Sequence, residues 1–253
     1  MPKKTVIGKC PLCLADGVPL LLSHIVPRFL WKDSGVTGSG HRFSLWSESH
    51  PDLSRRHLQD GFKEHLLCLQ CEGHFNKLET YAKPMLFGST SPIVVRASGD
   101  HIWTGLNYDK MKLFHMSILW RMAVSADLFY AFVKMAADES EILRKMLLAS
   151  NPGEPWQYGC LVTLLRHRGK PLVGIFSQPR EIPIRRDRCF RLVLAGMQWF
   201  MFGSGDAPKD APIETFLSHK GTWWLMQGEA EDCKYLRDEI DDLKKRLRAN
   251  QEV

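Results

Sequence analysis

Four cysteines toward the start of the chain have the spacing of metal ligands. Cys10 and Cys13 form one Cys-x-x-Cys pair, and Cys68 and Cys71 form a second. Two thiolates on a tight turn can reach one ion together, and two such pairs supply the sulfur ligands of a closed tetrahedral zinc site. The alternative is a pair of disulfides, but an odd total of seven cysteines and the lack of a signal peptide are not typical of a secreted scaffold. The sequence therefore predicts structural Zn²⁺.

A histidine and two carboxylates surround these pairs. The apolar run from Val18 to Leu22 predicts a strand, and His24 follows it almost directly. The second cysteine pair opens a predicted helix, on which Glu72 and Glu79 are spaced to share one face. A histidine with a pKa of about 6.5 is a suitable general base at neutral pH. Carboxylates are ligands that Mg²⁺ or Mn²⁺ prefers beside a phosphate.

This arrangement resembles the zinc-stapled branch of the HNH (His-Me finger) nucleases, similar to the recombination endonuclease VII type, over about residues 8 to 82. In that family a strand ends in an acidic residue and a histidine, and a helix starts at Cys-x-x-Cys. The resemblance implies that His24 is the base that activates water and that Glu72 holds a single divalent ion, Mg²⁺ or Mn²⁺, against the scissile phosphate. It implies metal-dependent endonucleolytic hydrolysis of nucleic acid, with DNA as the expected substrate.

One residue departs from the family pattern. Ser23 stands where the family has Asp, Glu or His as a first metal ligand. His74 competes with Glu72 as the other ligand. The carboxylates that could replace the missing ligand are Glu79, Glu64 and Asp60.

A second function therefore stays open, in which the module is not catalytic. His24 would then cap or pack at the end of a strand, and Glu72 would complement the positive end of a helix dipole. The zinc module would bind nucleic acid or a partner protein.

Basic side chains near the motif are the candidate phosphate contacts. Residues 33–59 are rich in Gly and Ser and predict a long polar loop that closes over nucleic acid or is simply solvated. A basic cluster between residues 166 and 191 is either a second nucleic-acid surface or a set of solvated turns. The residues predicted to contact nucleic-acid phosphates are Arg28, Lys32, Arg55, Arg56 and Lys77.

Composition limits the class of protein. The chain has 253 residues, 44% hydrophobic and 25% charged, with a net charge of +6. This charge is compatible with phosphate contacts and falls short of that of a non-specific electrostatic binder. No apolar run approaches the roughly eighteen residues that a bilayer span needs, so we expect a cytoplasmic protein that does not insert into membranes. A host-defence (antiviral) effector controlled by a regulatory partner would suit this chemistry.

The periodicity predicts an α+β fold in two parts. Residues 1–85 form a zinc-stapled ββα (treble-clef-like) module, and residues 86–253 form a helical and antiparallel-sheet domain of unassigned role. A charged amphipathic helix over 229–248 has an apolar stripe that suits packing on the domain or homo-oligomerisation. The other helices are predicted over 71–82 (ended by Pro84), over 108–128 with a continuation through Met135 after a break near Ala126, and over 139–149. The strands are predicted over 93–96, 101–104, 158–167, 171–176, 188–202 and 222–227.

Overall fold

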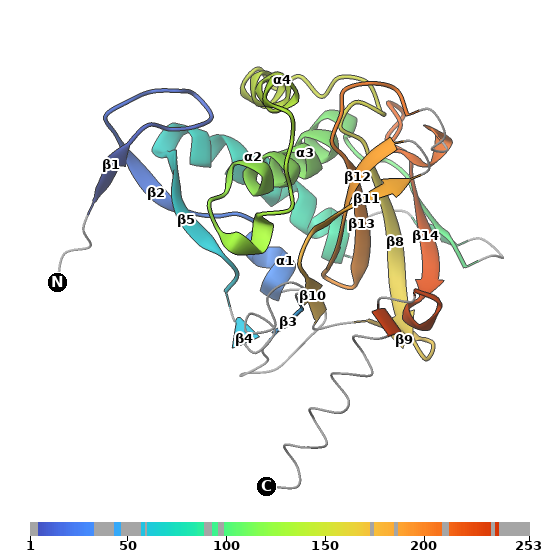
Figure 1. Ribbon diagram of the computed structural model, residues 1–253. Helices are drawn as coiled ribbons and strands as arrows, with labels where there is room; N and C mark the ends of the chain where they lie inside the picture. Colours follow the sequence, from blue (N-terminus) through green and yellow to red (C-terminus); the bar gives the residue numbers. More distant parts are fainter. Residues whose placement is uncertain are drawn as a thin grey trace, which may run out of the picture.

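The computed structural model shows a mixed α+β protein, as the periodicity predicts. Figure 1 shows a small sheet at one side, a large sheet at the other, and the main helices between them. The structure describes residues 5–32, 43–46, 57–58, 60–88, 93–95, 99–172, 175–184, 187–208, 213–233 and 236–237.

The small sheet carries the beginning of the motif. Its three strands, in the antiparallel order β1-β2-β5, are β1 (Val6–Gly8), β2 (Val18–His24) and β5 (Lys63–Cys68). Helix α2 (Leu69–Phe87) follows β5 without a linker. The assignment of these elements as a zinc-stapled ββα (treble-clef-like) module stays a prediction, because a short helix and two short strands lie between β2 and β5 in the chain.

Helix α2 does not stop before Pro84, so the predicted end at residue 82 is wrong. The helix includes Pro84 and ends at Phe87, and the Gly88 N–H donates to the Pro84 carbonyl at 2.8 Å. A proline in the last turn removes one backbone hydrogen bond near an end that is already frayed, which costs less than a proline in the middle of a helix.

The predicted polar loop over 33–59 is also partly wrong. It contains strand β3 (Phe43–Trp46) and strand β4 (His57–Leu58), which pair with each other. Strand β3 also pairs in parallel with the distant β10 (Ile175–Ser177). A short strand held by a partner so far along the chain leaves little signal in its own composition, because tertiary pairing overrides local preference.

Helix α3 (Tyr108–Val124) is the central element. It is buried on nearly all its faces and starts at Asn107, whose side chain accepts a hydrogen bond from the Lys110 N–H at 2.9 Å. Helix α4 (Ala137–Leu148) packs on it, and the short α1 (Arg28–Lys32) follows β2. Helices α3 and α4 are present where they are predicted, but the continuation of the first helix through Met135 is wrong, because α3 ends at Val124 and is followed by a 3-10 turn at Leu128–Tyr130 before α4. None of the helices described here is long and apolar enough to cross a membrane.

The large sheet has eight strands, but it is not wholly antiparallel as predicted. Its order is β11-β12-β13-β8-β14-β7-β6, with β9 beside β8, and β14 runs parallel to β8. The extended segment predicted over 188–202 is a hairpin that turns at Ala195 and Gly196, with φ of 56° and 76°. The strands are β6 (Ile93–Val95), β7 (His101–Trp103), β8 (Cys160–His167), β9 (Lys170–Pro171), β11 (Arg180–Ile184), β12 (Asp187–Leu194), β13 (Met197–Phe202) and β14 (Trp223–Glu229).

The predicted C-terminal helix does not begin at residue 229. Glu229 ends β14, and 3-10 turns occur at Ala230–Asp232, Leu128–Tyr130 and Ile213–Thr215. Residues 238–248 of the predicted helix lie outside the described residues.

A single buried cluster joins the two predicted parts of the chain. It includes Leu67 and Phe75 from the N-terminal side, Trp120 from α3, and Trp199 and Trp223 from the large sheet. The proposed boundary near residue 85 stays a prediction, and the structure adds that the two sides share their hydrophobic core.

Candidate functional site

The four predicted metal-ligating cysteines meet at one place. Their sulfur atoms all lie within 4.8 Å of one another. Cys10 and Cys13 lie on a tight turn after β1, in which Leu14 N–H donates to the Cys10 carbonyl at 2.8 Å. Cys68 ends β5 and Cys71 lies in the first turn of α2. The β5–α2 junction thus places the second pair against the first.

The chemistry of this cluster fits a metal with four sulfur ligands. The Cys13 and Cys68 sulfurs are 3.8 Å apart, far beyond the S–S bond length of about 2.05 Å, and all described cysteines are free. Burial raises the pKa of Cys10, but backbone N–H groups of Cys13, Cys68 and Leu12 together lower it to about 7. The thiolate that these donors favour is the form that binds metal.

His24 ends strand β2 and faces Asp60. Its Nε2 lies 3.8 Å from Asp60 Oδ1, and the side chain is 21% exposed. Burial lowers the pKa of His24, as does the nearby charge of Lys63, whereas Asp60 raises it. The ring is therefore neutral at pH 7 and able to accept a proton. Among the described residues Nε2 has no hydrogen-bond partner, and it is shielded from solvent.

Asp60 is a fixed anion between two cations. Arg28 Nε donates to Asp60 Oδ1 at 2.5 Å, and Lys63 Nζ donates to Oδ2. Burial raises the pKa of Asp60, but the bonds from Lys63 and Arg28 lower it to about 2. Arg28 is half exposed, so this cluster offers one guanidinium to solvent beside the neutral His24. We refer to His24, Asp60, Arg28 and Lys63 as the His24 cluster.

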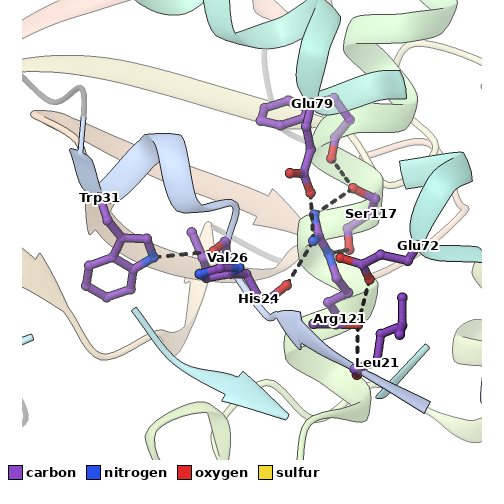
Figure 2. Close-up of polar contacts among 10 residues, drawn as sticks. Leu21, His24, Val26, Trp31, Glu72, Glu79, Ser117 and Arg121 are labelled. Carbon is purple, nitrogen blue, oxygen red and sulfur yellow. Dashed lines mark hydrogen bonds and ion pairs between the residues drawn. The ribbon is translucent and has the colours of Figure 1, made fainter. Parts of the chain in front are cut away.

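Glu72, the predicted metal ligand, is hydrogen-bonded to the residue that departs from the family pattern. Ser23 Oγ donates to Glu72 Oε2 at 2.6 Å, and Ser23 is fully buried (Figure 2). Successive side chains of a strand alternate in direction. Ser23 accordingly contacts α2 through Glu72, whereas the His24 ring lies beside Asp60.

Glu79 is also already paired. Arg121 of α3 is 1% exposed, and its Nη1 donates to Glu79 Oε1 and to the His24 carbonyl, each at 2.9 Å. Arg121 Nε and Nη2 donate to the carbonyl and hydroxyl of Ser117 at 3.2 and 3.3 Å. Figure 2 shows this guanidinium between Glu79, Ser117 and the end of β2.

The other candidate ligands have structural partners. His74 Nε2 lies 3.0 Å from the Leu147 carbonyl at the end of α4. Glu64 accepts from Ser125 Oγ and from the Ala126 and Asp127 N–H groups just after α3. These contacts tie α2 to α4 and β5 to the end of α3, so they explain both residues without a metal.

The donor set does not fit the expected Mg²⁺ or Mn²⁺. In the part of the chain that the structure describes, the four cysteines are the only close group of three or more metal-ligating residues. Glu72 is hydrogen-bonded to Ser23 and Glu79 to Arg121. Mg²⁺ at phosphate sites is held by one or two carboxylates together with water and phosphate oxygens, and here each of the two carboxylates is already hydrogen-bonded to a protein donor.

The predicted nucleic-acid contacts divide into two groups. Arg28 is exposed in α1 within the His24 cluster, and Lys77 is exposed on α2. Arg55, Arg56 and the side chain of Lys32 lie outside the described residues.

Sequence reasoning missed Arg121 and Ser117. One signal for Arg121 was available, because an arginine inside a helix that is apolar on nearly every face needs a buried partner. Its partner, Glu79, was considered only as a metal ligand.

Comparison with known proteins gives no match, whether with protein-family models, with curated proteins or with solved structures. The resemblance to HNH nucleases thus depends on the residues of the motif alone.

Proposed function

We propose that this chain is a zinc-stapled, HNH-like endonuclease that hydrolyses phosphodiester bonds, with DNA as the expected substrate and His24 as the general base. The observation that carries this proposal is a neutral histidine beside a half-exposed arginine, at the end of the strand β2 that pairs with β5, whose last residue is Cys68.

Zinc is the metal proposed for the cysteine cluster. Four thiolates in a compact cluster suit a soft, tetrahedral ion, and four protein ligands leave no open position for water. The ion would tie the turn after β1 to the β5–α2 junction. Its role is structural, and it supports β2 and therefore the position of His24.

His24 accepts a proton from an attacking water in this proposal. The lowered pKa keeps the imidazole in its basic form at neutral pH. We assign the contact with the substrate phosphate to Arg28, because it is the more exposed of the two cations bound to Asp60. Asp60 remains anionic and holds both cations next to the ring.

A plasmid-nicking assay tests this assignment. We expect His24→Ala to lower the cleavage rate by roughly 10²- to 10⁴-fold, the usual contribution of a general base, while zinc content and fold are retained. His65→Ala is the matched control, since His65 lies in the neighbouring strand β5 and is exposed. A folded His24→Ala variant that cleaves at the wild-type rate would overturn the proposal.

A second candidate is a non-catalytic zinc module that binds nucleic acid or a partner protein. Two observations favour it: His24 Nε2 is shielded from solvent, and Glu72 is satisfied by Ser23. This alternative predicts retention of DNA by the purified protein in a gel-shift assay without cleavage under any metal condition.

A further inference from the structure

A buried cation lies where the motif leads one to expect a divalent ion. Arg121 bridges Glu79, on the same face of α2 as Glu72, and the backbone carbonyl of His24 (Figure 2). We infer that Arg121 is the built-in cation of this region, and that Mg²⁺ and Mn²⁺ do not bind between β2 and α2.

The charges of the site support this inference. A guanidinium keeps its positive charge at any pH the protein meets, so Arg121 cannot be neutralised to make room for a metal. It is 1% exposed and therefore poorly screened by solvent. A divalent ion near Glu79 would be repelled by this positive charge and would compete with Arg121 for the carboxylate that forms its ion pair.

The hydrogen bonds of Arg121 make its displacement unfavourable. The guanidinium donates to Glu79, to the His24 carbonyl, and to both the carbonyl and the hydroxyl of Ser117. Removing it from these partners would leave a buried charge and several buried acceptors unsatisfied. Arg121 thus already occupies the position beside Glu79 that a divalent ion would need.

Arg121 is a positioning residue. Its burial keeps it from touching substrate, and its bond to the His24 carbonyl holds the end of β2 against α3. This second role rests on the proposed function, because it matters only if His24 is the base. The statement about divalent ions does not depend on nuclease activity.

Electron paramagnetic resonance of Mn²⁺ tests the inference on the full chain loaded with zinc. The signal of free Mn²⁺ falls when the ion binds, so a titration gives the number of bound ions without any substrate. Elemental analysis before and after confirms that zinc stays in place. The variants are Glu72→Gln and Glu79→Gln, with Glu154→Gln, a half-exposed carboxylate in the C-terminal half, as the matched control for weak surface binding.

We expect the wild type, Glu72→Gln and Glu154→Gln to give the same weak Mn²⁺ curve. One Mn²⁺ per chain in the wild type, lost in Glu72→Gln or Glu79→Gln and kept in Glu154→Gln, would overturn the inference. Absence of nuclease activity together with unchanged Mn²⁺ curves would defeat the proposed function alone. Metal-dependent nicking with Mn²⁺ bound through Glu72 would defeat the inference alone.

Discussion

The cysteine cluster and the His24 cluster share strand β5, which carries both Cys68 and Lys63, but the two regions differ in how their charged groups are paired. The four sulfurs lie within 4.8 Å of one another, and none of them forms a disulfide. Around His24, each nearby carboxylate is bound by a protein donor: Asp60 by Arg28 and Lys63, Glu72 by Ser23, and Glu79 by Arg121.

The difference shows how far a motif can be trusted. Paired cysteines at this spacing in a reduced chain have few uses besides binding a soft metal. Carboxylates and arginines also serve as ion pairs and helix contacts, so their place in a motif does not fix their role. Substituting one partner at a time tests this difference.

The largest effect is expected from Cys68→Ser. Metal binding contributes on the order of 10 kcal/mol in small zinc domains, and the cysteine cluster links the turn after β1 to β5 and α2. We expect loss of zinc together with a free energy of unfolding that is lower by several kcal/mol, measured by elemental analysis and urea denaturation.

Cys233→Ser provides the control for this experiment, because Cys233 lies outside the cluster and contacts Gln198 only at 3.8 Å. It should keep zinc and stability. Equal zinc content in Cys68→Ser and in the wild type would show that the cluster is not the metal site.

A smaller but still large effect is expected from Arg121→Met. Removing one partner of a buried ion pair costs about 3 to 5 kcal/mol, and Glu79 and the His24 carbonyl would lose their donor. Urea denaturation measures the change. Lys145→Met on α4 removes an exposed partner of Glu141 and should have no measurable effect. Similar stabilities for these two variants would contradict the account of Arg121 as a buried cation.

The smallest expected effect is a change in the pKa of His24. Substituting Asp60 and substituting Lys63 should change this pKa in opposite directions. Asp60 raises this pKa and Lys63 lowers it. Asp60→Asn should therefore lower the pKa of His24 further, and Lys63→Met should raise it, as followed by NMR titration of the imidazole. A shift of the same sign in both variants would mean that these charges do not control the ring.

The lowered pKa of His24 also determines how the stability of the fold changes with pH. The pKa of folded His24 is lower than the value of 6.5 for the unfolded chain. The folded state thus resists protonation, and its stability is complete above pH 6.5 and falls as pH drops through the folded value. The cleavage rate should fall at low pH as His24 becomes protonated. In Asp60→Asn this fall should occur at a lower pH than in the wild type.

Local signals in the sequence predicted much of the fold. The Cys-x-x-Cys pairs, the strand before His24, and the helices α3 and α4 follow from spacing and periodicity and are present in the structure. The α+β class follows from the change between helical and extended patterns. These features depend on residues close together in the chain.

The rest depends on distant partners. The pairing of β3 with β10 and the parallel pairing of β14 with β8 join segments far apart in the sequence. The site also depends on distant partners. The sequence alone predicts a free carboxylate at Glu79, and the structure shows that Arg121 of α3 is paired with it. Ser23 differs, since its departure from the family pattern was visible, and only its bond to Glu72 was not.

Anomalous diffraction from crystals soaked in Mn²⁺, with data at the zinc and manganese edges, tests the contrast between the two regions most directly. We expect one zinc peak at the centre of Cys10, Cys13, Cys68 and Cys71, and no manganese peak beside Glu72 or Glu79. A manganese peak between β2 and α2, or no metal among the four cysteines, would contradict it.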